Sequence, residues 1–214
     1  MTKAEKKRAQ IGAAVDGRAA EVYRTAAKII LQKGYDGTSV SDIADALGIT
    51  KAGLYHYISG KTELLYEIMK FGLDELTQQV MVPAQAIADA EQRLRFVIST
   101  HARLVMEGDG AVTILVDEAR ALSPVQNRKV TKLKRAYLDF IRATFDELNA
   151  QGKLRGVNTT VAAFSIIGSI NWLSRWYQSE GALSKAEVAE QIADIAFNGV
   201  LHQEPLRAGQ LRSI

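Results

Sequence analysis

The chain contains no cysteine, and this absence removes several kinds of chemistry at once. Without thiols it can form no disulfide, no thiolate zinc site, no iron–sulfur cluster and no thiol redox switch. Its three histidines, His56, His101 and His202, lie far apart in the sequence. Glycine-rich nucleotide loops and the motifs of zinc peptidases and serine hydrolases are also missing. We therefore expect no catalytic residues, no metal site and no cofactor, and hence no enzyme.

Proline is scarce too, with three residues in a chain of 214. A chain poor in proline and rich in Ala, Leu, Ile, Glu, Lys and Gln favours long helices over many short strands joined by turns. Hydrophobic residues make up 47% and charged residues 24%, close to the globular average, which excludes general disorder. We predict an all-α protein.

The chain also lacks a long apolar run. Its most apolar segment, residues 161–173, is interrupted by Ser165, Ser169 and Asn171 and falls short of the roughly 18–20 residues that span a bilayer. The first residues, MTKAEKKRAQ, are basic, but no apolar run with a cleavage site follows them. We expect a cytoplasmic protein with no membrane partner.

Positive charge is concentrated in the first third of the chain. Residues 1–61 contain ten Lys or Arg and six Asp or Glu, whereas the remaining residues contain 17 and 18. This distribution is typical of a segment that binds a polyanion beside a near-neutral domain. A solvated basic tail would explain it equally well.

The first third also has a helical pattern. Residues 1–17 are interpreted as a basic flexible arm, and apolar residues then recur at steps of three and four from Ala19 to Ile30, up to a stop at Gly34. Ser39 and Asp42 have the spacing of an N-terminal helix cap, and Gly48 ends this second helix.

A third short helix, over residues 51–58, is predicted after the cap Thr50. Two short helices joined by a tight turn form a helix-turn-helix. A long helix follows over 61–80 and is expected to end before Pro83. Further helices are predicted at 84–90, 91–107, 111–122, 125–151, 157–178 and 185–201, with a loose tail at 202–214.

The exposed face of the helix at 51–58 has an unusual composition. With Leu54 and Ile58 turned inward, the solvent side presents Lys51, Tyr55, His56 and Tyr57, and Gly53 allows close access. Hydroxyls and lysine can bind phosphates, and aromatic rings or a histidine can contact base edges. Chance exposure of two tyrosines is the alternative for this helix taken alone.

The wider segment resembles a known family. Residues 25–65, TAAKIILQKGYDGTSVSDIADALGITKAGLYHYISGKTELL, resemble the DNA-binding domain of the TetR family of bacterial transcription regulators. The resemblance implies a dimeric helical repressor with a helix-turn-helix domain at 18–62 and a ligand-binding and dimerisation domain at 63–201. It implies phosphate contacts from Thr38, Tyr57 and Lys61, a phosphate or base contact from Tyr55, and a groove-facing role for Lys51, Gly53 and His56. The candidate contacts to double-stranded operator DNA are Thr38, Ser39, Thr50, Lys51, Gly53, Tyr55, His56, Tyr57 and Lys61.

Lys61 also has a physical reason to bind phosphate. It lies at a predicted helix start, where its charge adds to the free amides and the partial positive charge of the helix. The alternative is an ordinary surface lysine.

Residues 115–122 and 171–201 resemble the TetR branch that senses acyl-CoA thioesters and controls fatty-acid or sterol-ring breakdown. The resemblance implies a small effector that releases the repressor from DNA; a different hydrophobic or aromatic effector of an efflux or other catabolic operon is the alternative. The candidate effector contacts are His101, Arg120, Tyr137, Phe164, Trp172, Arg175 and Trp176. His101 could instead be a satisfied core histidine, and Arg175 could form an ion pair with Asp117 or Glu118.

The predicted helix at 157–178 is apolar on nearly all its sides, so we expect it to be buried all round. Together with the helix at 185–201 it would form a four-helix interface in a homodimer, as the family implies, with Val188, Ile192, Ile195 and Val200 as candidate contacts. An intramolecular core is the alternative. A helical scaffold protein without DNA binding would leave the face of residues 51–57 unexplained.

Overall fold

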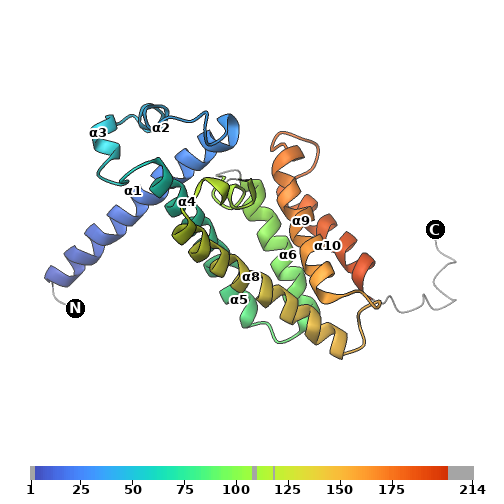
Figure 1. Cartoon of the computed structure of the whole chain (residues 1–214). Helices are drawn as coiled ribbons and strands as arrows, with labels where there is room; N and C mark the ends of the chain where they lie inside the picture. The colour runs from blue at the N-terminus through green and yellow to red at the C-terminus, as the bar shows by residue number, and fades with distance from the viewer. Residues whose placement is uncertain (1–2, 108–109, 118, 202–214) are drawn as a thin grey trace. The chain divides into compact units, whose positions relative to one another are not determined.

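A computed structural model describes residues 3–107, 110–117 and 119–201 (Figure 1). These residues form helices and turns and no strand, apart from one isolated antiparallel bridge between Leu154 and Leu201. The predicted all-α fold is confirmed. None of the described helices is both long and apolar enough to cross a membrane. The expected tail at 202–214 lies outside the described residues.

The chain forms two compact units. The first combines residues 1–77 with 107–135, and the second combines residues 78–106 with 136–214. The first unit therefore includes more than the expected helix-turn-helix domain at 18–62, because α4 packs against α1 and α7. The domain borders expected from the sequence remain a prediction about function.

Seven helical elements belong to the first unit. Helix α1 packs against α2, α4 and α7, and α2 packs against α3 (Figure 1). Buried apolar side chains at these contacts include Val22 and Ile30 of α1, Ile43 of α2 and Leu54 of α3. The elements are α1 (Lys3–Lys33), α2 (Val40–Ala46), α3 (Lys51–Leu54), α4 (Lys61–Leu76), α7 (Ile114–Asp117), the 3-10 helix η2 (Ala119–Ala121) and the first half of α8 (Pro124–Ala150).

Helix α1 begins at Lys3, whereas the sequence suggested an arm that ends at Gly17. Residues 3–16 consist mainly of Ala, Lys, Arg, Glu and Gln, which are good helix formers. One glycine in a helix costs about 1 kcal/mol relative to alanine, and this is too little to end a long helix. The helix therefore runs through Gly17.

We predicted that Pro83 would end a helix, but it does not. After α4 the chain passes through a π-helical turn, η1 (Thr77–Met81), and Pro83 then lies in the first turn of α5 (Val82–Gln85). Proline is tolerated there because the amides of a first helical turn have no partner within the helix. The helix expected at 84–90 is corrected to α5.

The helix expected at 111–122 is also shorter in the structure. Residues 111–113 form a turn before α7, and η2 follows it. The turn lies directly against α4, because a Cβ atom built on Gly72 would be 2.4 Å from the carbonyl oxygen of Ala111. Close backbone contact of this kind requires glycine at position 72, and residues 111–113 form a turn there instead of continuing a helix.

The second unit contains α6 (Ala90–Glu107), the second half of α8, α9 (Thr159–Trp176) and α10 (Lys185–Val200). Its core is built from apolar side chains of all four helices. Ion pairs connect α6 to its neighbours: Arg93 to Glu147 of α8 at 2.8 Å, Arg95 to Glu190 and, at 2.9 Å, to Asp194 of α10, and Glu91 to Lys153, which follows α8, at 2.5 Å. Buried core residues include Leu94, Val97, Ile98, Ile141, Phe145, Ile166, Ile170, Leu173 and Ala193.

Candidate nucleic-acid interface

Polar caps fix the start of α2. The Ser39 hydroxyl accepts a hydrogen bond from the Asp42 amide at 3.1 Å, and the Ser39 amide donates to the Asp42 carboxylate at 2.7 Å. Lys33 of α1 donates to the other carboxylate oxygen of Asp42 at 2.6 Å. The Lys33 ammonium, followed by the Ser39 groups, holds the pKa of Asp42 far below its usual range. Asp42 therefore links α1 to the capping box of α2.

Thr50 starts α3 in the same way, because its hydroxyl accepts a hydrogen bond from the Gly53 amide at 3.0 Å. A Cβ atom on residue 53 would lie 3.2 Å from the Thr50 hydroxyl oxygen. Glycine at position 53 therefore leaves room for the Thr50 cap and also gives a ligand access to α3. The α-helix ends at Leu54, and residues 55–57 form a tighter turn, so the expected helix at 51–58 is shortened.

The surface predicted to read DNA is exposed on this short helix and turn. Tyr55 is 48% exposed, Tyr57 is 37% exposed, and Lys51 and His56 are also exposed. Leu54 is fully buried on the other side and anchors the helix to its unit. Two large aromatic side chains therefore face water on an element of barely two turns, with their hydroxyls available to a ligand.

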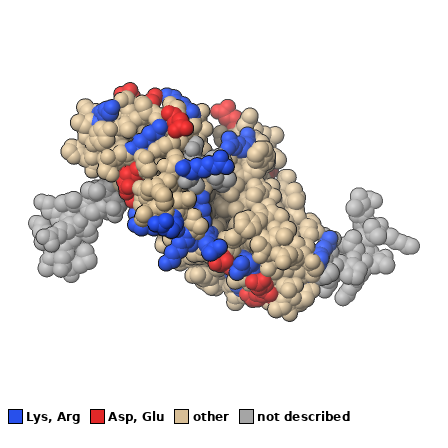
Figure 2. All heavy atoms as spheres, in the orientation of Figure 1, with Lys and Arg blue, Asp and Glu red and all other residues tan. Residues whose placement is uncertain are grey.

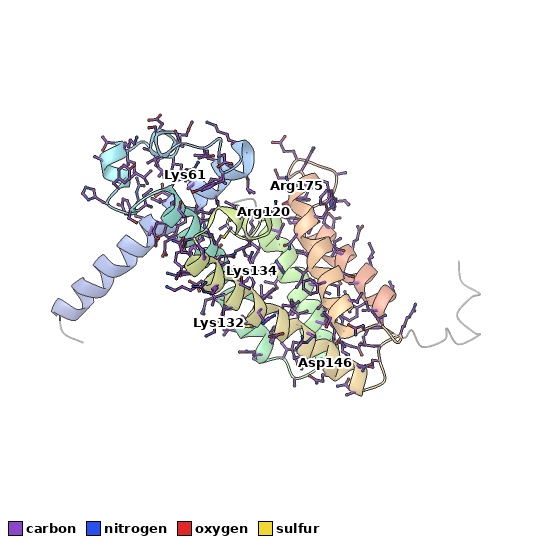
Figure 3. All side chains as sticks on the ribbon, viewed as in Figure 1. Lys61, Arg120, Lys132, Lys134, Asp146 and Arg175 are labelled. Carbon is purple, nitrogen blue, oxygen red and sulfur yellow. The ribbon has the colours of Figure 1, made fainter. Side chains whose placement is uncertain are left out.

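Lys61 lies at the first position of α4, a helix of 16 residues. Its ammonium nitrogen is 4.2 Å from the centroid of the Tyr35 ring and 3.5 Å from the carbonyl oxygen of Asp36. The free amides of the first turn of α4 and the Lys61 charge share this end of the helix, which suits an anion. Figure 3 marks Lys61 at the start of α4.

Thr38 is placed differently from the expectation of a phosphate contact. It is only 2% exposed, and its hydroxyl donates to the carbonyl oxygen of Gly34 at 2.8 Å. Gly34 has a φ angle of 75°, the left-handed conformation in which glycine ends a helix. Thr38 therefore closes the turn after α1, and its hydroxyl is not presented on the surface in this structure.

A second basic surface, on α8, escaped the sequence interpretation. Arg128, Lys132 and Arg135 are exposed and recur at steps of four and three, which places them in one row on the solvent side of the helix. The signal is present in the sequence, because no Asp or Glu occurs between residues 119 and 138. Lys134 differs, since its ammonium donates to the Leu115 carbonyl and burial lowers its pKa.

Lys and Arg atoms are spread over the visible face of the molecule, with fewer acidic atoms among them (Figure 2). Figure 3 marks Lys132 on the outer side of α8. Exposed positive charge of this kind attracts a polyanion before any specific contact forms. Within the described residues, no group of His, Asp and Glu side chains could hold a metal ion.

The predicted effector residues fall into separate groups. His101 and Tyr137 meet in the core of the second unit, where the Tyr137 hydroxyl lies 3.2 Å from His101 Nδ1. Phe164, Trp172, Arg175 and Trp176 are instead exposed on one face of α9. Arg120 is exposed on η2 in the first unit. The suggested partners of Arg175, the Asp117 side chain and Glu118, lie outside the part that the structure describes.

Helix α9 is not buried all round within one chain, so the expected burial of its other side would have to come from a second subunit. Ala162, Ile166, Ile170 and Leu173 face the core, whereas its opposite face is open to solvent. Trp172 is 64% exposed there, and nothing lies within 4 Å of a Cβ atom built on Gly168. The exposed face combines Val161, Phe164, Gly168, Trp172, Arg175 and Trp176; we refer to it as the α9 face.

The four candidate dimer residues of α10 also separate. Ile195 is 68% exposed, and Ile192 and Val200 are partly exposed. Val188 is only 3% exposed, so it belongs to the core of its own chain. The expectation that it contacts a second subunit is therefore corrected. The helix begins as predicted, with Ser184 and Glu187 forming a capping box.

Comparisons with known proteins place this geometry among bacterial regulators. Residues 22–68 match the family described as bacterial regulatory proteins, tetR family, and residues 88–200 match the tetracyclin repressor-like C-terminal domain. The HTH-type transcriptional repressor KstR2 of Rhodococcus jostii (strain RHA1) is 29% identical over 86% of this chain and 91% of its own length.

Two solved structures of AibR have the same fold. The crystal structure of apo AibR is 33% identical, covers 83% of this chain and 97% of its own, and has a TM-score of 0.76. The crystal structure of AibR in complex with isovaleryl coenzyme A and operator DNA is 36% identical, covers 85% of this chain and 96% of its own, and has a TM-score of 0.74.

Proposed function

Because the chain belongs to the TetR family of bacterial regulatory proteins, we propose that it represses transcription from a pseudo-palindromic operator as a homodimer and is released by an acyl-CoA thioester. Members of this family are transcription regulators rather than enzymes. They bind operator DNA as dimers, and they also bind small-molecule effectors. A regulator that acts on operator DNA works in the cytoplasm. The proposal therefore assigns the chain to that compartment.

The observation that carries the DNA-binding part is the exposed surface of α3 and the turn after it. Lys51, Tyr55, His56 and Tyr57 form this surface, and Lys61 opens the next helix. Tyrosine hydroxyls and lysine contact phosphates and fix the protein on the duplex, whereas His56 is the side chain suited to a base edge. Two such surfaces in a two-fold dimer read two half-sites, hence a pseudo-palindromic operator.

The α9 face together with Ile195 is the proposed dimer interface. Large apolar side chains that face water are stabilised when a second apolar surface covers them, by about 25 cal/mol for each Å² removed from water. Gly168 leaves room at the centre of the face for a partner helix to come close. A surface that exposes several large apolar side chains together is typical of a protein–protein contact.

Two observations support an acyl-CoA effector. The AibR structure that covers 85% of this chain holds isovaleryl coenzyme A together with operator DNA. In this chain, Arg175 shares the α9 face with Trp172 and Trp176, which combines a cation for phosphates with aromatic surface for apolar groups. Since the same face is the proposed dimer interface, the CoA part of an effector bound there would contact both subunits.

Release from DNA requires the effector to prefer a dimer whose two α3 helices no longer fit successive major grooves. A tenfold loss of operator affinity corresponds to a coupling free energy of about 1.4 kcal/mol. A modest difference in effector affinity between the two arrangements is therefore sufficient.

A gel-shift titration in a salt series, followed by calorimetry against acyl-CoA thioesters of increasing chain length, tests the proposal. We expect salt-dependent binding to duplex DNA and micromolar or tighter binding of at least one thioester, with free CoA and free fatty acid binding more weakly. Absence of DNA binding would refute the repressor. DNA binding without any thioester binding would favour a repressor with a different hydrophobic effector.

A further inference from the structure

A histidine interrupts the apolar stripe of α6 in the core of the second unit. Residues at steps of three and four along this helix are buried and apolar, except for His101, which is 2% exposed. Buried polar groups usually have hydrogen-bond partners, so each one without a partner needs an explanation. The other members of the stripe are Leu94, Val97, Ile98, Leu104 and Val105.

One nitrogen of His101 has a partner and the other does not. Tyr137 of α8 places its hydroxyl 3.2 Å from His101 Nδ1, and the two rings meet edge to face with centroids 5.5 Å apart. His101 Nε2 is buried and makes no hydrogen bond with any residue that the structure describes. Burial lowers the pKa of His101 to about 4 and raises the pKa of Tyr137, so both groups are neutral near pH 7.

The neutral imidazole carries one proton, and the Tyr137 contact decides where it resides. If Nδ1 donated to the hydroxyl oxygen, the hydroxyl proton and Nε2 would both lack a partner. If the hydroxyl donates to Nδ1, the ring proton is on Nε2 and a single donor remains unpaired. The second arrangement leaves fewer unpaired groups, so Nε2 is a hydrogen-bond donor held in an apolar environment.

The chemistry of the surroundings selects the acceptor. A buried water needs two to four polar partners, whereas the other members of the α6 stripe are apolar. A carboxylate would bring an unpaired charge into an apolar core. A carbonyl oxygen accepts one hydrogen bond without charge, and it fits a single donor among apolar side chains.

We propose that His101 Nε2 donates a hydrogen bond to a carbonyl oxygen of the effector, and that Tyr137 is the positioning residue that holds the imidazole in the donating tautomer. This inference rests on the proposed function and adds a selection rule to it. The effector carries a carbonyl group at the apolar end of its site, either the thioester carbonyl or a ketone of the acyl group. A purely hydrocarbon group there leaves the donor unpaired and binds more weakly.

Paired probes that differ in one carbonyl group test the rule by calorimetry. The first pair is an acyl-CoA thioester and the S-alkyl-CoA thioether of equal chain length. The second pair is an acyl-CoA with a ketone in its acyl group and the same compound with a methylene. We expect the purified wild-type protein to bind the carbonyl member of one pair about tenfold more tightly. The pair that shows the difference identifies the carbonyl.

The variants separate hydrogen bonding from packing. His101→Leu should bind both members of that pair equally, whereas His101→Gln, which keeps an amide donor, should retain part of the preference. Tyr137→Phe should reduce the preference because the ring proton is then free to move to Nδ1. Ser99→Ala is the matched control: its hydroxyl is also buried without a partner on α6, and the change should leave the preference intact.

The outcomes are distinct from those of the proposed function. If thioesters bind and release DNA but wild type shows no preference in either pair, or His101→Leu keeps the preference, this inference is overturned and the proposed function stands. If no CoA compound binds, both fail. Nitrogen NMR of the imidazole gives a check that needs no ligand, since a proton on Nδ1 of wild-type His101 would also overturn the inference.

Discussion

The α3 surface and the α9 face both expose large aromatic side chains, yet their surroundings differ in kind. Tyr55 and Tyr57 end in hydroxyls and lie on the same short segment as Lys51. Phe164 and Trp172 lie beside Gly168, whose position is open to solvent. The first set suits a hydrated, charged partner, and the second suits another apolar surface.

This difference shows that exposure alone does not identify a partner. A phosphate backbone is bound through charges and hydrogen bonds from groups that stay partly hydrated. Exposure of tyrosine hydroxyls and lysine to solvent in the free protein therefore costs little free energy. An apolar face gains free energy only when water is removed from it. The α3 surface should therefore respond to salt, and the α9 face should respond to any charge placed within it.

The largest effect is expected from a charge in the proposed dimer interface. Ile195→Glu would bury an unpaired carboxylate in the dimer and weaken association by several kcal/mol. Sedimentation at micromolar concentration should show monomers, and operator binding should fall with the loss of the dimer. Asn149→Glu adds the same charge to the exposed end of α8 and should leave the dimer unchanged. A stable Ile195→Glu dimer with normal operator binding would place the interface elsewhere.

Removal of the Lys61 charge should weaken binding to all DNA sequences alike. A hydrogen bond to a charged group contributes about 1.5–3 kcal/mol, and each lost phosphate contact lowers the slope of log K against log salt by about 1 per subunit. Lys61→Ala tests this in a salt series. Lys153→Ala removes an equal charge from the second unit and should leave the slope unchanged; an unchanged slope in both proteins would exclude Lys61 from the phosphate contacts.

His56 should affect the choice of sequence rather than general affinity. If its ring contacts a base edge, His56→Ala should alter the preference at one operator position by about 1–3 kcal/mol. Binding of the variant to a set of single-base operator changes measures this. Equal losses at every position would mean that His56 supports the backbone contacts only.

The smallest effect is expected on the acid stability of the contact between α1 and α2 that Asp42 makes. Because the folded pKa of Asp42 lies below its unfolded value, Asp42 contributes stability above about pH 4, which is lost as the pH falls through the folded pKa. The thermal midpoint of wild type should therefore fall more steeply than that of Asp42→Asn as the pH drops below about 4. Asp45→Asn, an exposed change on the same helix, should follow wild type. Parallel curves for all three proteins would contradict the role of Asp42 as a link to Lys33.

Features that depend on neighbouring residues could be predicted from the sequence, whereas features that depend on distant parts of the chain could not. The caps at Ser39 and Ser184 and the turn at Gly48, whose φ angle is 64°, could be predicted because each depends on residues within one or two helical turns. The burial of Thr38 and the position of Pro83 could not, since they depend on how a neighbouring turn folds back. The exposed α3 side chains followed from local spacing.

The α9 helix shows the limit of that reasoning. Its apolar residues on all sides predict extensive burial, but the sequence does not say whether the cover comes from the same chain or a second one. The structure of one chain separates Ile170, which is covered, from Trp172, which is not. Likewise, His101 and Tyr137 meet across two helices, and no local pattern in the sequence joins them.

The central claim is that binding of an acyl-CoA thioester lowers the affinity of the dimer for operator DNA. The most direct test is the fluorescence anisotropy of a labelled operator bound to the protein, followed while a thioester is added. We predict that anisotropy falls to the value of free DNA with a thioester and stays high with free CoA. Anisotropy that stays constant for every thioester, although calorimetry shows the thioester binding, would contradict the claim.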